Sequence, residues 1–100
     1  MTKLETDEAV IRSAINKADL PESVLEVKTE FDADATGDPA VWLYVIVSDK
    51  EANSRKFSQS SLDILEKLRE AVQQTGVDRW PYIRFRSESE QATLSEEDSG

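Results

Sequence analysis

Aromatic residues and arginines recur at alternate positions in two short apolar stretches, AVWLYVIV (residues 40–47) and WPYIRFR (residues 80–86). Alternate residues of a β-strand point to the same side, so each stretch would gather its aromatic and basic side chains on one face. Such side chains bury apolar area and bind charge, which is the chemistry of a binding surface. The candidate binding residues are Trp42, Tyr44, Trp80, Tyr82, Arg84 and Arg86.

Residues suited to catalysis are scarce. The sequence has neither histidine nor cysteine, which removes the most frequent general base, the thiolate nucleophile and the usual zinc ligands. Its 3 glycines form no phosphate-binding loop or nucleophile elbow. Serines at positions 58, 60 and 61 are better explained as helix caps than as nucleophiles. We therefore predict a protein that is not an enzyme and has no cofactor.

The acidic segment DADATGDP (residues 32–39) partly resembles a calcium-binding loop of the D-x-D-x-[DN]-G type. However, the twelfth position is Leu43 instead of a bidentate glutamate, and strands rather than helices are expected on either side. The same residue types are frequent turn formers. The sequence therefore favours a wide β-hairpin loop and disfavours calcium binding at Asp32, Asp34 and Asp38.

Hydrophobic periodicity predicts two helices. The first begins near Thr6 or Asp7 and ends before Pro21. Its buried stripe has helical spacing and contains Ile11, Ala14, Ile15 and Ala18. The second begins at a cap provided by Ser58, Ser60 or Ser61, and it ends at Gly76, which suits a left-handed C-terminal cap. Its predicted buried stripe consists of Leu62, Leu65, Leu68 and Val72.

Three strands are predicted, at residues 24–31, 40–47 and 80–86. The middle one is apolar on both faces and belongs in the centre of a sheet, whereas Pro81 indicates an edge position for the last. A hairpin makes the first two strands antiparallel, and a helical crossover makes the second and third parallel. In the first strand the predicted core side consists of Leu25, Val27, Thr29 and Phe31. The predicted fold is α+β, a two-layer α-β-β-α-β arrangement with a three-stranded mixed sheet and two helices on one face.

Charge divides the chain into two parts. Residues 1–86 are predicted to form a single domain, and residues 87–100 a flexible acidic tail. The tail has five acids and no base, which is more than half of the formal net charge of -9. No stretch approaches the ~20 apolar residues of a membrane span, and the N-terminus lacks the apolar segment of a signal peptide. A cytoplasmic location is therefore expected.

The predicted fold leaves the sheet face opposite the helices open, with both tryptophans and both tyrosines of the chain on it. An exposed aromatic patch beside arginines usually marks a protein interface, so we expect a protein partner or a homodimer. Cover by the tail or the N-terminal residues is a further possibility. The alternative function is binding of single-stranded RNA or DNA through the same face, which the acidic composition disfavours.

Two segments, TGDPAVW (residues 36–42) and WPYIRFRSESEQATL (residues 80–94), resemble a group of short, uncharacterised bacterial proteins. These proteins share a D-x-TG-[DE]-PA element before a hydrophobic strand and an aromatic-Pro-Tyr strand ending in FRS-x-SEQA. They are often encoded beside a HEPN-domain protein. The resemblance implies a toxin–antitoxin-like or accessory role and places residues 87–94 in the domain or in its partner contact. It supplies no catalytic residue.

Overall fold

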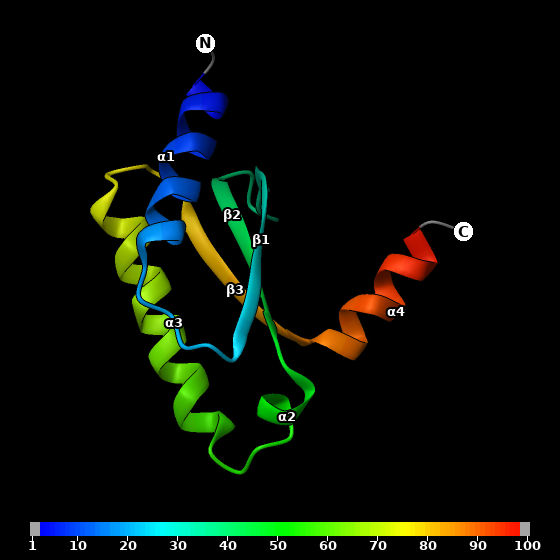
Figure 1. Cartoon of the computed structure of the whole chain (residues 1–100). Helices are drawn as coiled ribbons and strands as arrows, with labels where there is room; N and C mark the ends of the chain where they lie inside the picture. The colour runs from blue at the N-terminus through cyan, green and yellow to red at the C-terminus, as the bar shows by residue number, and fades with distance from the viewer. Residues whose placement is uncertain (1–2, 99–100) are drawn as a thin grey trace.

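The computed structural model describes residues 3–98, which form a three-stranded sheet with helices α1 and α3 on one face (Figure 1). The strand order is β1-β2-β3, with β1 antiparallel and β3 parallel to the central β2. The predicted α+β fold with a mixed sheet is therefore confirmed. The elements are α1 (Lys3–Lys17), β1 (Val24–Ala33), β2 (Pro39–Val47), α2 (Asp49–Ala52), α3 (Phe57–Gln74), β3 (Trp80–Ser87) and α4 (Glu88–Asp98).

The hydrophobic core lies between the sheet and the two long helices. Alternate residues of β2 contribute most of the sheet side, because their side chains are fully buried under the helices. Burial of one such aliphatic side chain contributes about 1.5–3 kcal/mol to folding. The buried cluster consists of Ile11, Ile15, Val41, Leu43, Val45, Val47, Ile64, Leu68 and Val72. One face of the sheet is thus used for folding, and the opposite face remains available.

Two leucines that were predicted to be buried are exposed. Leu25 is 52% exposed because a β-bulge between Val24 and Glu26 shifts the register, and Val24 packs against the core instead. Leu62 is 64% exposed. It lies two positions before the buried Ile64, so it points about 200° around the helix from the core side.

The predicted N-caps of α3 are wrong. The helix begins at Phe57, after Lys56 at the N-cap position, where no side chain caps the backbone. Phe57 packs edge-on against Phe85, with ring centroids 5.7 Å apart. This contact favours a helix that begins at Phe57, before the serines. Gly76 follows the helix with a φ of 75°, as the cap prediction required. The serines inside the first turns are Ser58, Ser60 and Ser61.

Two short helices were absent from the prediction, and α1 begins at Lys3 rather than near Thr6. Helix α4 occupies the segment that was predicted to be a flexible tail. Ser87 ends β3 and caps α4, since its Oγ accepts the Glu90 N–H while Glu90 Oε1 accepts the Ser87 N–H, each at 3.2 Å. This reciprocal pair is a capping box. The flexibility of the segment in solution stays a prediction, and residues 99–100 lie outside the described residues.

Candidate functional site

All six predicted binding residues lie on the sheet face opposite α1 and α3. Across β2 and β3 the register pairs Trp42 with Tyr82 and Tyr44 with Arg84. The remaining two residues are at alternate positions of the same strand, β3, and therefore point the same way. We call this surface, formed by Trp42, Tyr44, Trp80, Tyr82, Arg84 and Arg86, the aromatic face. Its role in binding stays a prediction, but its geometry can be described.

Ring contacts fix the middle of the aromatic face. Trp42 and Tyr82 stack with centroids 5.2 Å apart and planes inclined by 18°. The Arg86 guanidinium lies over Tyr44, with Cζ 4.1 Å from the ring centroid. An aromatic pair of this kind contributes about 0.5–1.5 kcal/mol beyond its buried area, and a cation–π contact contributes a similar amount. These contacts therefore hold the side chains of Trp42, Tyr82, Tyr44 and Arg86 in place.

Trp80 has no such ring contact. It stands at the start of β3, where it pairs in the register with Ala40. It is 58% exposed, although tryptophan side chains are highly buried on average. Arg84 is exposed as well, and Lys28 of β1 lies exposed beside Tyr44 in the register. The face thus combines a fixed aromatic centre with one free tryptophan and two free-standing basic side chains.

Both tyrosine hydroxyls on the face donate hydrogen bonds to carboxylates. Tyr44 donates to Glu30 Oε2 at 3.2 Å, and Tyr82 donates to Asp34 Oδ2 at 3.1 Å. Burial raises the pKa of Tyr44, and the Glu30 carboxylate raises it further. The pKa of Tyr82 is raised by burial and by its bond to Asp34. Both phenols therefore stay protonated at neutral pH and serve as donors that fix the rings.

The loop between β1 and β2 closes one end of the aromatic face. Asp34 Oδ1 accepts the backbone N–H groups of Thr36 and Asp38, at 2.9 and 3.1 Å, and the Thr36 hydroxyl at 2.6 Å. The hydroxyl bond is the largest cause that lowers the pKa of Asp34. Because the other Asp34 oxygen accepts from Tyr82, this carboxylate organises the turn and the face together. Among residues 3–98, no three His, Cys, Asp or Glu side chains gather in a way that could hold a metal ion.

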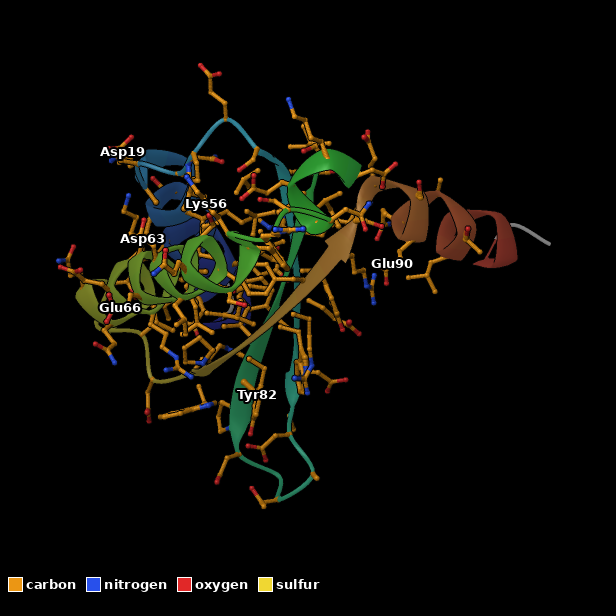
Figure 2. The ribbon with its side chains drawn as sticks, turned by 90° about the horizontal axis from the view of Figure 1, so that it is seen from below. Asp19, Lys56, Asp63, Glu66, Tyr82 and Glu90 are labelled. Atoms are coloured by element: carbon orange, nitrogen blue, oxygen red, sulfur yellow. The ribbon has the colours of Figure 1, made fainter. Side chains whose placement is uncertain are left out.

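Helix α4 closes the opposite end of the face. Ile46 lies on the same side of β2 as Trp42, yet it is only 4% exposed, and α4 contacts both β2 and β3 at this end. The Arg86 guanidinium donates to Gln91 Oε1 at 3.1 Å. Beyond this attachment α4 extends away from the sheet, on the side opposite α1 and α3 (Figures 1 and 2). Intramolecular cover therefore reaches both ends of the face, through the β1–β2 loop and through α4, and leaves Trp80 exposed.

A contact with α2 fixes the direction in which α4 leaves the sheet. The Asp49 carboxylate accepts the Ser89 hydroxyl at 2.6 Å and the Ser89 N–H at 3.2 Å. These bonds lower the pKa of Asp49, with the hydroxyl bond as the largest cause. Glu88 Oε1 in turn accepts the Asp49 N–H at 3.4 Å. Sequence reasoning missed this helix, although the S-x-x-E pattern from Ser87 to Glu90 is a signal that could have found it.

A buried ion pair positions the start of β3, and the sequence prediction did not include it. Arg79 donates from Nε to Asp7 Oδ2 at 3.2 Å and from an Nη to the Ala40 carbonyl at 2.8 Å. Its guanidinium also lies over the Phe31 ring, with Cζ 5.6 Å from the centroid. The side chains of the pair are 13% and 11% exposed. This network links α1 to the strand end from which Trp80 projects; no sequence signal pairs residues so far apart.

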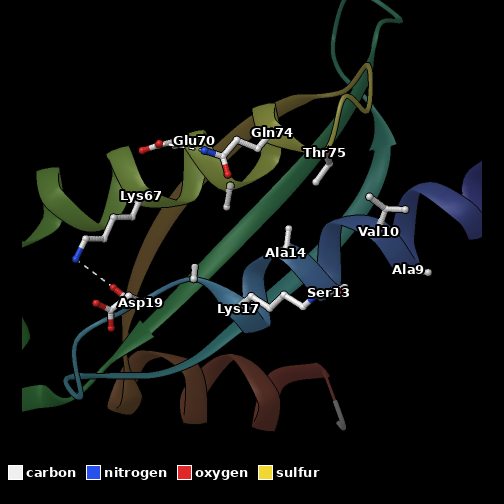
Figure 3. Close-up of a pocket in the computed structure, with 12 residues that line it drawn as sticks. Ala9, Val10, Ser13, Ala14, Lys17, Asp19, Lys67, Glu70, Gln74 and Thr75 are labelled. Carbon is white, nitrogen blue, oxygen red and sulfur yellow. Dashed lines mark hydrogen bonds between the residues drawn. The ribbon is translucent and has the colours of Figure 1, made fainter.

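A groove of about 680 Å³ lies between α1 and α3 (Figure 3). Small side chains such as Ala14 and Ala71 line it. Its lining includes two lysines and two carboxylates, so the groove would favour neither an anionic nor a cationic ligand. The Lys67 ammonium donates to the Asp19 carbonyl across one end, at 3.1 Å. The groove lacks the aromatic side chains and arginines of the aromatic face. We therefore treat the aromatic face as the candidate site.

Comparison of the chain with protein-family models, curated proteins and solved structures gave no significant match. Across residues 3–98, each helix is too short or too polar to span a membrane.

Proposed function

We propose that this protein is a non-enzymatic interaction module whose aromatic face binds another protein chain. The observation that carries the proposal is Trp80, which is 58% exposed beside the Trp42–Tyr82 stack on the sheet face that α1 and α3 leave open. Tryptophan, tyrosine and arginine are the residues most enriched at the energetic centres of protein interfaces. Their fixed geometry also lowers the entropy lost on binding.

The acidic charge supports an antitoxin-like or accessory role within this proposal. A chain with a formal net charge of -9 is suited to cover a basic surface of a partner, such as an RNA-binding site. The resemblance to proteins encoded beside HEPN-domain proteins points in the same direction. We include a bacterial, cytoplasmic setting in the proposal, since a chain without cysteine needs no oxidising compartment.

Binding of single-stranded nucleic acid is the competing function, and the ring contacts argue against it. Base stacking needs free ring faces. Trp42 already stacks on Tyr82, and Arg86 covers one face of Tyr44, which leaves Trp80 as the ring on this face without a ring or cation–π contact. The carboxylate of Glu30 also lies within hydrogen-bonding distance of Tyr44 on this surface. A protein partner, which can contact ring edges and arginines together, fits the face better.

Site-specific photo-crosslinking in cells tests the proposal. A benzophenone amino acid replaces Trp80 in one variant and Leu62 in the control, because Leu62 is similarly exposed, at 64%, on α3. We expect a discrete protein adduct from position 80 and none from position 62. Equal labelling from both positions, or an adduct at position 80 that nuclease removes, would overturn the proposal.

A further inference from the structure

The described side-chain hydrogen bonds of helix α4 to the rest of the chain come from its first residues. The helix has 11 residues, and its described contacts with the rest of the protein involve its first turns. Isolated helices shorter than about 12–15 residues are marginal in water, so most helices of this length depend on packing. Its only apolar side chains are Ala92 and Leu94, hence a partner would contact α4 chiefly through charge.

The charges of α4 and of the aromatic face are complementary. Residues 88–98 contain five acids and no base. Arg84 on β3 and Lys28 on β1 flank Tyr44 of the central strand on opposite sides. Both are exposed and have no carboxylate partner among the described ion pairs and hydrogen bonds. A second copy of the same chain would therefore complement both surfaces. Its acidic helix α4 would lie against the basic side chains, and its aromatic face would stack on the aromatic face of the first copy.

Dimensions favour the same arrangement. Two sheets stack about 10 Å apart, and an 11-residue helix is about 16 Å long. Helix α4 leaves its own sheet on the side of the aromatic face, so it is long enough to reach a sheet stacked on that face (Figure 2). Three strands of about eight residues cover roughly 26 by 14 Å, which gives two copies a flat area of roughly 700 Å². That is less than the about 1,000 Å² expected of a specific interface, and the two α4 helices would supply the difference.

We propose that a second copy of this chain covers the aromatic face, with the acidic helix α4 of each copy lying against Arg84 and Lys28 of the other. The inference rests on the proposed function, since it names the partner of the same face. The aromatic side chains of the two copies would pack against each other between the sheets, and the α4 helices would flank the stacked sheets. This arrangement explains why a short polar helix projects from the open side of the sheet.

Light scattering of the full chain over a concentration series, at low and high salt, tests the inference. We expect a dimer that persists at high salt, because the aromatic contact is not electrostatic. Arg84→Glu should weaken dimerisation at least tenfold, as should reversal of three α4 acids (E96K, E97K and D98K). A chain that carries Arg84→Glu together with the three α4 substitutions should dimerise with a Kd within about threefold of that of the natural protein. The matched control is Arg69→Glu, an exposed arginine on α3, which should change nothing.

The outcomes separate this inference from the proposed function. A monomer at every concentration overturns the second copy, and an adduct of that monomer with a different protein from position 80 would still support the proposed function. A monomer without any adduct overturns both. A dimer that tolerates Arg84→Glu and Trp80→Ala uses another surface, and single variants that weaken the dimer without mutual rescue overturn the α4 contact. Circular dichroism of each variant confirms that it is folded.

Discussion

Replacement of Trp80 by alanine separates a binding role from a folding role. Because the side chain is 58% exposed and makes no ring contact, its loss should lower the free energy of unfolding by about 1 kcal/mol or less. As an energetic hot spot of the proposed interface, Trp80 should contribute about 2 kcal/mol to binding, which alanine removes. A symmetric dimer loses two such side chains, or about 4 kcal/mol, which raises its Kd roughly a thousandfold.

The assay measures both quantities in the same protein. Light scattering gives the dimer Kd, and thermal unfolding below that Kd gives the stability of the monomer. For a domain of this size about 1 kcal/mol corresponds to a Tm shift of about 4–8 °C. Leu62→Ala, on the opposite side of the molecule, should leave the Kd unchanged. A Trp80→Ala protein with an unchanged Kd, or with a Tm lowered by more than about 15 °C, would refute the reasoning.

Further predictions concern the supports of the aromatic face and the competing ligand. Arg79→Met should destabilise the protein by about 3–5 kcal/mol in urea unfolding, because it leaves Asp7 buried without its partner; a loss below about 1 kcal/mol would show that the pair is dispensable. Because the pKa of Asp34 is lowered on folding, its contribution to stability should be fully present above its unfolded pKa, near 3.8, and should disappear as the pH falls through the lower folded pKa. Asp34→Asn should flatten this part of the urea stability profile between pH 5 and pH 2, and an unaltered profile would contradict the assigned role. Ser87→Ala should remove the capping box and cost α4 about 1 kcal/mol, seen as lost helical circular dichroism, whereas Glu90→Gln, which keeps the acceptor, should lose less. Single-stranded oligonucleotides should bind only weakly, and their affinity should fall steeply as the salt concentration rises. Tight binding of an oligonucleotide would favour the competing function, nucleic-acid binding.

The central strand and the aromatic face were predictable from sequence because they depend on a period of two. The continuous apolar run around Leu43 required burial on both sides, and Pro81 indicated the edge position of β3, which the strand order confirms. Once the strand order was known, parity placed Trp42 and Tyr82 on the same face. These inferences use local pattern and short-range geometry, which a single sequence contains.

Errors arose where local choices depend on tertiary contacts. The bulge that exposes Leu25 is set by the pairing of β1 with β2, and the early start of α3 is set by the contact between Phe57 and Phe85. The pairing of Asp7 with Arg79 joins residues from opposite ends of the chain. Helix α4 was missed for another reason: the acidic composition outweighed the capping signal that begins at Ser87.

The emission of Trp80 tests most directly whether another protein chain covers the aromatic face. The chain has 2 tryptophans, so Trp42→Phe leaves Trp80 as the single reporter and keeps an aromatic ring against Tyr82. We predict that the emission maximum moves to shorter wavelength as the concentration rises, in step with the molecular mass from light scattering. An emission that stays at the position of a water-exposed tryptophan while the mass doubles would contradict the account.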